Sequence, residues 1–318
     1  MMGALEEGLG LEIVLWFNGV PDYLRYALAP LAALGSELGI MITVAVVYWS
    51  IDMRAGRRLL LMVLGSQIVS MLGKVAFARP RPFQVAPDRI DPLGTPEGFG
   101  LPSGHTVFGT VSGLWLADRA RRRWVTVVAT LYIVLMGLSR MVHGVHYPQD
   151  VLLGWILGLL FFLIYRAVEK GAARRGIAPF WAITPSRSVP LVLLFSGVLF
   201  VVVLLLDGTF EERKGVLSVV GGLSGALIGF TVDSRKLRFS SDGPIGQRVL
   251  RLLLGLPILG ALHFGLAGAY YEVIGEATGA GALLLYLFRY ALLGSAAAVG
   301  VPWLLRLLAL APARRNSF

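Results

Sequence analysis

Long apolar runs separated by short polar segments recur along the whole chain of 318 residues. A membrane-spanning helix needs about 20 mainly apolar residues, and nine runs approach or reach that length. They cover residues 36–51, 58–77, 104–116, 124–138, 151–168, 189–206, 215–232, 249–270 and 282–305. The pattern predicts an all-α membrane protein with about nine transmembrane helices. The third run is short, and its start is the boundary that the pattern defines least well.

The first 35 residues are more polar than these runs. Residues 11–34 mix aromatic side chains such as Trp16 with Asn18 and Asp22. Such a mixture is typical of a segment that lies in the membrane interface, so we expect residues 1–35 to form an N-terminal interfacial segment. The first ten residues contain two Glu and no Lys or Arg, unlike the basic start of a cleavable signal peptide.

The basic residues are concentrated in alternate loops. Lys and Arg are enriched in the cytoplasmic loops of membrane proteins, and 20 of the 29 fall in one set of segments: residues 52–58, 117–123, 166–188, 233–251 and 306–318. The distribution predicts an N-terminus outside and a C-terminus in the cytoplasm. In this orientation, the ionisable residues of three other segments all lie on the extracytoplasmic face of the plasma membrane. These segments are residues 74–82, 102–105 and 138–150.

Composition agrees with this class of protein. The chain is 56% hydrophobic and 15% charged, with a mean hydropathy of +0.73, far from the average soluble domain. The net charge of +10 is explained by the loops, so we expect no nucleic-acid partner. The chain has no cysteine, which excludes disulfides and thiolate metal sites.

The second apolar run closes with the sequence Lys-Val-Ala-Phe-Ala-Arg-Pro-Arg-Pro. Its Lys74 lies inside the apolar boundary, where an unpaired cation is costly, so we expect an anionic partner or a wet cavity. Arg81 follows almost two helical turns later and would share the face of Lys74, although the prolines around it make the last turn irregular. Taken alone, both residues also fit cations that anchor a helix end at the membrane surface.

A second polar segment precedes the third run and reads Pro-Ser-Gly-His. Pro102 and Ser103 stand where a cap would begin a helix. The backbone N–H groups at that start, which Gly104 leaves uncrowded, are suited to phosphate oxygens. His105 then lies on the first turn, beside the bound anion. Taken alone, a histidine at a helix start is more often structural.

The third segment, residues 138–150, holds two of the four histidines. Arg140 offers a planar fork suited to two phosphate oxygens. His146 and Asp150 are four residues apart across a predicted helix start, so the carboxylate can reach one ring nitrogen and leave the other free for nucleophilic attack. His143 has no carboxylate at the matching position, and we expect it to be a neighbour. A neutral His–Asp pair that closes a loop is the structural alternative.

Together the three segments resemble the type 2 phosphatidic acid phosphatase superfamily of integral-membrane phosphatases. Its motifs are Lys-x6-Arg-Pro, Pro-Ser-Gly-His and Ser-Arg-x5-His-x3-Asp, and this chain matches every motif position. The resemblance covers residues 11–170. It implies a five-helix catalytic core within residues 36–170 and leaves the last four spans unexplained. The apolar runs and basic residues after the core predict a basic cytoplasmic linker (171–188) and a four-span accessory region (189–318).

The resemblance also implies roles for the matching residues. His146 would be the nucleophile that forms a phosphohistidine, Asp150 would orient it, and His105 would protonate the leaving oxygen and then activate water. The phosphoryl oxygens would be held by Lys74, Arg81, Ser103, Gly104 and Arg140. No metal or other cofactor is required in this scheme. One histidine must start neutral and the other protonated, which predicts a bell-shaped pH profile.

The substrate that carries the phosphate stays open at this stage. The leading hypothesis is a lipid phosphate or diphosphate at the outer leaflet, such as undecaprenyl diphosphate, phosphatidic acid or phosphatidylglycerophosphate. A sugar-phosphate phosphatase similar to glucose-6-phosphatase is the alternative within enzymes, and a non-catalytic lipid-binding or transport protein is the alternative from another class. A homodimer also stays open.

The accessory region repeats none of the three motifs. Its Gly-Gly-Leu-Ser-Gly-Ala stretch, residues 221–226, favours close helix packing. Arg289 lies inside the last run and needs a partner, for which Glu272 and Glu276 are candidates; a snorkelling or purely structural arginine is the alternative.

Overall fold

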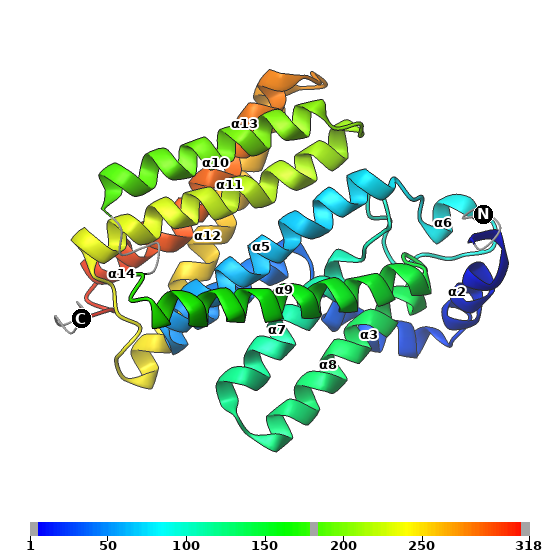
Figure 1. Ribbon diagram of the computed structural model, residues 1–318, viewed down its shortest axis with the longest axis horizontal. Helices are drawn as coiled ribbons and strands as arrows, with labels where there is room; N and C mark the ends of the chain where they lie inside the picture. Colours follow the sequence, from blue (N-terminus) through cyan, green and yellow to red (C-terminus); the bar gives the residue numbers. More distant parts are fainter. Residues whose placement is uncertain (1–5, 179–183, 313–318) are drawn as a thin grey trace. The chain divides into compact units, whose positions relative to one another are not determined.

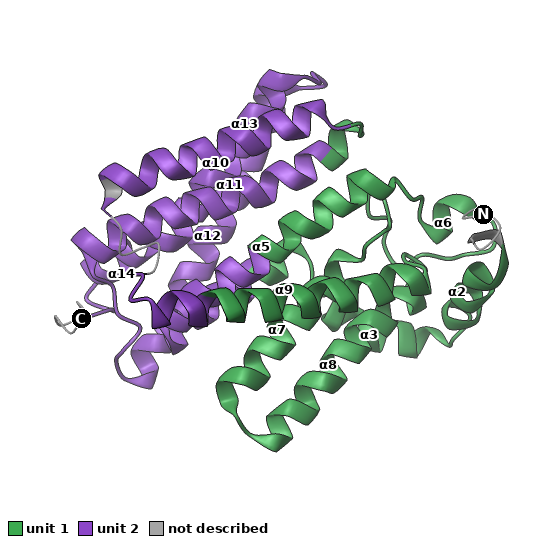
Figure 2. Ribbon diagram, viewed as in Figure 1, with its two compact units in different colours: residues 1–40, 65–168, 207–212 green, residues 41–64, 169–206, 213–318 purple. Residues whose placement is uncertain are grey.

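The computed structural model describes residues 6–178 and 184–312, and every regular element in this part of the chain is a helix. The chain divides into two compact units, which Figure 2 shows in different colours. Unit 1 comprises residues 1–40, 65–168 and 207–212; unit 2 comprises residues 41–64, 169–206 and 213–318. All three motifs belong to unit 1.

Unit 1 contains the N-terminal helices and the helices that follow the motifs (Figure 1). Its elements are α2 (Leu11–Asn18), α3 (Asp22–Leu34), the second half of α5 (Met53–Phe77), α6 (Pro82–Val85), α7 (Gly104–Ala120), α8 (Arg123–Val142) and most of α9 (Pro148–Arg174). Helices α7 and α8 lie side by side, and α2 and α3 pack on α8. A small core of Leu11, Val14, Ile90 and Tyr147 joins the first helix to the third motif.

Polar contacts tie the N-terminal helices to unit 1. The Asn18 amide donates to the Val142 carbonyl over 3.1 Å, and Arg25 forms an ion pair with Asp91 at 2.7 Å. The Nε2 atom of His143 lies 3.1 Å from the Arg25 carbonyl oxygen. The segment predicted to lie in the interface is therefore part of the packed unit.

Unit 2 contains the helices of the accessory region. Its elements are most of α4 (Glu37–Val46), the π-helical turn η2 (Val47–Ile51), the first half of α5, α10 (Pro185–Leu205), α11 (Phe210–Val232), η4 (Asp233–Leu237), α12 (Ile245–Ile274), α13 (Ala280–Ser295), η5 (Ala296–Gly300) and α14 (Val301–Leu307). Gly221 and Gly225 lie directly against the backbone of α13, where any side chain would collide with the carbonyl groups of Leu287 and Ala291. The close packing predicted for this stretch is confirmed.

Neither candidate carboxylate, Glu272 or Glu276, pairs with Arg289. No described carboxylate pairs with Arg289, which instead stacks over the ring of Tyr290, 4.9 Å from its centroid, and donates to the His263 carbonyl over 3.5 Å. The face of an aromatic ring attracts the guanidinium, and this contact does not require a second charged group to be removed from water.

Seven helices in the described part of the chain are long and apolar enough to cross a membrane. The bent pair formed by α3 with α4 and η2 would be an eighth, and α7 has 17 residues. Helices thus occupy all nine predicted positions, and the multi-span, all-α class is established. Residues 1–5, 179–183 and 313–318, which include Arg314 and Arg315 of the basic tail, lie outside the described residues.

Candidate active site

The first motif occupies the end of α5 and the loop behind it. Lys74 lies in the last turn of α5 and donates from Nζ to the Phe99 carbonyl over 2.6 Å. The helix ends at Phe77, and Arg81 caps the short helix α6. The expectation that Arg81 shares a helix face with Lys74 is therefore wrong, because the Arg-Pro-Arg-Pro sequence ends the helix a turn early.

The second motif begins α7 at Gly104, the start that the sequence predicted. Ser103 is the N-cap, and its hydroxyl oxygen accepts hydrogen bonds from the backbone N–H of Thr106 at 3.4 Å and from the Thr106 hydroxyl at 2.9 Å. The N–H groups of Gly104 and His105 occupy the first turn, where a helix offers them no internal partner. A Cβ atom at position 104 would lie 3.1 Å from Oε1 of Gln67, so that any side chain larger than that of glycine would crowd this amide.

The third motif joins the end of α8 to the start of α9. Helix α8 continues to Val142, so that Arg140 lies in its last turn, and α9 begins at Pro148 with Asp150 in its first turn. The Ser103 N–H donates to the Asp150 carbonyl over 3.1 Å. This backbone bond fixes the second motif against the third.

His146 and Asp150 form the pair that their spacing predicted. Nδ1 of His146 lies 3.2 Å from Oδ2 of Asp150, and both side chains are buried. The same oxygen accepts the Tyr147 N–H at 2.9 Å, while Oδ1 is 3.3 Å from Nη1 of Arg79. A carboxylate held by these donors places the ring proton on Nδ1 and leaves the lone pair of Nε2 available.

Arg81 is aimed at that lone pair. Its Nη1 atom lies 3.1 Å from Nε2 of His146 and donates to the Val145 carbonyl over 3.1 Å. Its Nε atom donates to the Gly98 carbonyl over 2.9 Å. The guanidinium is thus fixed in one orientation beside the imidazole.

Arg140 differs from the other cations of the site. Its side chain is buried, and among the described residues it has no hydrogen-bond or ion-pair partner; its Nε atom is fully enclosed without one. A buried, unpaired guanidinium is costly, so this position indicates an anion-binding role. Arg140 and Lys74 both act electrostatically on the ring of His146.

The protonation of the two loop histidines follows from their surroundings. Burial lowers the pKa of His146 well below its ordinary value, and the positive charges of Arg81, Lys74 and Arg140 lower it further. His146 is therefore neutral near pH 7, as a nucleophile must be. Burial and the charge of Arg140 lower the pKa of His143 to about 4. His143 contacts the backbone of α3, in agreement with its expected role as a neighbour.

His105 is held by the N-terminal segment. Its ring forms a hydrogen bond with the Ala32 backbone and packs on Gly35, where a Cβ would lie 2.5 Å from Cδ2 of the ring. It also acts electrostatically on His146. The structure thus brings the predicted site residues from all three motifs into one unit.

Sequence reasoning missed two charged neighbours. Arg79 pairs with Asp150 and lies over the Tyr147 ring, 4.4 Å from its centroid. Glu212, in the first turn of α11, is buried beside Gly98 and attracts Lys74 and Arg81. The position of Arg79 in the Arg-Pro-Arg sequence of the first motif could have indicated that it belongs to the site. Nothing in the local sequence linked Glu212 to the motifs.

Positive charge exceeds negative charge in the site. The cations are Lys74, Arg79, Arg81 and Arg140, and the nearby carboxylates are Asp150 and Glu212. Such an excess around a neutral imidazole suits a phosphoryl group, whose negative charge the cations would neutralise.

Comparison with known proteins agrees with this chemistry. Residues 55–173 match the family model described as the PAP2 superfamily. Residues 217–314 match a second model, described as the transmembrane extension of PAP2 superfamily phosphatases. The two matches cover the motif segments and most of the accessory region.

Three relatives illustrate the range of similar proteins. The chain is 30% identical over 100 residues to an undecaprenyl-diphosphatase of Sulfolobus acidocaldarius (30% of this chain, 48% of the relative). It is 32% identical over 100 residues to phosphatidylglycerophosphatase B of Bacillus subtilis (29% and 49%). It is 38% identical over 80 residues to human glucose-6-phosphatase 3 (21% and 23%). The chain thus spans about half the length, or less, of these curated relatives.

Proposed function

The chain belongs to the PAP2 superfamily, and we propose that it is a membrane phosphatase that hydrolyses a lipid phosphate or diphosphate through a phosphohistidine on His146. The observation that carries the proposal is the position of the buried Arg140, whose side chain has no partner among the described residues, beside a neutral His146 whose Nδ1 atom is bound by Asp150. A phosphoryl group supplies the anion that Arg140 lacks and the electrophile that His146 requires.

In the first half of the reaction, Nε2 of His146 attacks phosphorus. The new N–P bond forms as the bond between phosphorus and the leaving oxygen breaks, and His105 gives its proton to that oxygen. Asp150 keeps the Nδ1 proton in place and stabilises the positive charge that develops on the ring. The dephosphorylated lipid, or the lipid monophosphate from a diphosphate, leaves with the proton.

In the second half, water attacks the phosphohistidine. His105 is now neutral and takes a proton from the water as its oxygen bonds to phosphorus. The N–P bond breaks, inorganic phosphate leaves, and both histidines return to their starting states. Lys74, Arg81 and Arg140, with the N–H of Gly104 and the capping residue Ser103, hold the phosphoryl oxygens through both steps.

A lipid substrate is supported by the surface beside the first motif. Phe77, at the end of α5, is 51% exposed, and Val85, in α6, is 38% exposed. Apolar side chains at a membrane surface accommodate an acyl or prenyl chain whose headgroup reaches the cations behind them. The names of the first two relatives point to the same substrate class.

The proposal is tested by phosphate release from the purified protein. The substrates are undecaprenyl diphosphate, phosphatidic acid and phosphatidylglycerophosphate in detergent micelles, and glucose 6-phosphate dissolved in the same buffer. We expect release from at least one lipid and none after His146→Ala, whereas His263→Ala, a histidine change in α12, leaves the rate unchanged. Activity retained by His146→Ala contradicts the mechanism, and release from glucose 6-phosphate alone contradicts the lipid assignment.

The proposal includes nine spans, an N-terminus outside and a site on the extracytoplasmic face of the plasma membrane. The alternation of basic loops supports it. Because the chain has no cysteine, Asp88→Cys and Arg122→Cys each provide a single thiol. We expect a membrane-impermeant maleimide to label Asp88→Cys on intact cells and Arg122→Cys only after lysis; the reverse result contradicts the orientation.

A further inference from the structure

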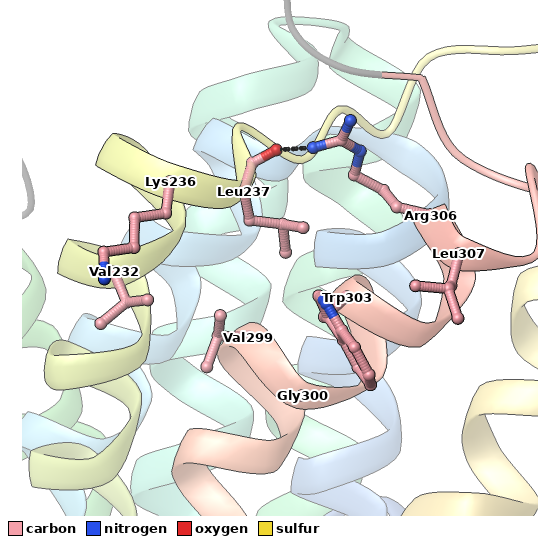
Figure 3. Close-up of a pocket in the computed structure, with 8 residues that line it drawn as sticks. All are labelled: Val232, Lys236, Leu237, Val299, Gly300, Trp303, Arg306 and Leu307. Carbon is pink, nitrogen blue, oxygen red and sulfur yellow. Dashed lines mark hydrogen bonds between the residues drawn. The ribbon is translucent and has the colours of Figure 1, made fainter.

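Unit 2 contains a groove of about 650 Å³ between the end of α11 with η4 and the last helix, α14. Figure 3 shows Val232 and Lys236 on one wall and Trp303 and Leu307 on the other, with Gly300 at the base. The groove belongs to the accessory region and shares no residue with the phosphatase site.

The walls combine apolar surface with positive charge. Trp303 is 55% exposed and Leu307 is 67% exposed, so that the groove offers large apolar side chains to a ligand. Two cations, Lys236 and Arg306, line it, and no acidic residue does. Among the described residues Lys236 has no hydrogen-bond or ion-pair partner, while Arg306 donates to the Leu237 carbonyl and is held in place by it (Figure 3).

The groove lies where two candidate membrane spans end. One span runs to Leu237 and the other to Leu307. The apolar sequence of α11 changes at η4 to Asp-Ser-Arg-Lys, which marks the passage from hydrocarbon to headgroups. Tryptophan is enriched at this depth, in agreement with the exposed ring of Trp303.

Glycine keeps the base of the groove open. A Cβ on Gly300 would meet only a methyl group of Ala296, at 3.7 Å, in its own helix turn. No other side chain therefore lies within 4 Å of that position, and a ligand atom can approach the backbone of Gly300. Apolar walls, a cationic rim and a position at the headgroup level are the features that bind an anionic lipid between transmembrane helices.

We propose that this groove binds one anionic phospholipid, with its phosphate between Lys236 and Arg306 and the first part of an acyl chain against Trp303 and Gly300. Charge complementarity selects the headgroup, because the groove has cations and no carboxylate. The site is independent of the phosphatase reaction proposed above, and its lipid is a ligand and not a substrate.

The test is native mass spectrometry of the full chain in detergent, titrated with dioleoyl phosphatidylglycerol or dioleoyl phosphatidylcholine. We expect the first phosphatidylglycerol to bind at least about five-fold more tightly than phosphatidylcholine, since one cation near an anionic surface contributes about that factor. Lys236→Gln with Arg306→Gln should abolish the preference, and Gly300→Leu should prevent retention of the first lipid.

Two control variants make the result specific. Lys170→Gln removes an exposed lysine of the same unit that does not line the groove, and Arg140→Gln removes a cation of the phosphatase site; both should keep the preference. Equal binding of the two lipids to the wild type overturns the proposal. So does a preference that survives in the Lys236→Gln, Arg306→Gln protein or disappears in Arg140→Gln.

Discussion

Nη1 of Arg81 lies 3.1 Å from Nε2 of His146, the ring nitrogen that Asp150 leaves free. The lone pair of the proposed nucleophile therefore faces a cation before the substrate binds. A phosphoryl oxygen that takes over this guanidinium frees the lone pair and at the same time brings phosphorus toward it. Binding and activation are thereby coupled through one arginine.

Arg79 is expected to position Asp150 without touching the substrate. Arg79→Gln removes the ion pair with Asp150, and the carboxylate then holds the His146 ring less firmly. We expect kcat to fall by about ten-fold or more, since small errors in the position of a reacting group are costly, with KM nearly unchanged. Steady-state kinetics on the lipid substrate measure both.

Arg89→Gln is the matched control for this change, because Arg89 is half-exposed and its ion pair is with the exposed Glu12. It should leave kcat within about two-fold, as a surface ion pair contributes little. If Arg79→Gln raised KM and left kcat unchanged, Arg79 would be a substrate ligand instead.

The pH profile should report the low pKa of His146. The neutral form attacks, so the acid limb of kcat/KM lies where His146 becomes protonated, well below pH 6.5. The charge of Lys74 contributes to this lowering. Lys74→Gln should therefore raise the pKa and move the acid limb to higher pH, at a reduced rate. An acid limb that stays in place in Lys74→Gln would mean that another group controls it.

The sequence predicted the parts of the site that depend on local geometry. The spacing of His146 and Asp150 was enough to predict their contact, because Pro148 starts a helix between them. Ser103 could be recognised as a cap because it stands directly before the start of a predicted helix. The pairing of Arg79 with Asp150 could not be predicted from the sequence. It depends on how the irregular end of α5 meets the start of α9, and Ala78 at that end has a left-handed conformation. The aromatic rings under Arg289 belong to Tyr286 and Tyr290 of its own helix, α13, so this contact is local. Its hydrogen bond to the His263 carbonyl, in contrast, depends on how α12 and α13 pack together.

Arg140 should show opposite effects on activity and stability. Arg140→Gln removes a buried cation that has no partner among the described residues, so we expect the melting temperature to stay the same or rise. The activity should fall by about a hundred-fold or more, the usual effect of losing a group that stabilises transition-state charge. Thermal unfolding in detergent and kcat/KM provide the two measurements.

Arg57→Gln gives the contrasting case. Arg57 is equally buried but forms an ion pair with Asp233, whose side chain is 1% exposed. The change removes this cation from the buried pair, and breaking a buried ion pair costs about 3–5 kcal/mol, so the melting temperature should drop. Arg140 would prove to be a structural residue if its replacement destabilised the protein as much as that of Arg57.

Gly35 should control the position of His105. Its backbone φ of −84° suits any residue, so Gly35→Ala introduces no backbone strain. The added methyl group would lie 2.5 Å from Cδ2 and 3.0 Å from Cγ of the His105 ring, and the ring must move. A displaced His105 protonates the leaving oxygen poorly, so we expect kcat on a lipid phosphate to fall by roughly ten- to a hundred-fold.

The leaving group separates this effect from a general loss of structure. p-Nitrophenolate leaves phosphorus without needing a proton. In Gly35→Ala, the rate of the first step, in which the leaving group departs, should therefore fall far less for p-nitrophenyl phosphate than for the lipid. Gly197→Ala, at a position in α10 with open space around it, should leave both rates unchanged. If Gly35→Ala slowed the release of the leaving group in a single turnover equally on the two substrates, the methyl group would disturb the phosphate site as a whole and not the proton donor.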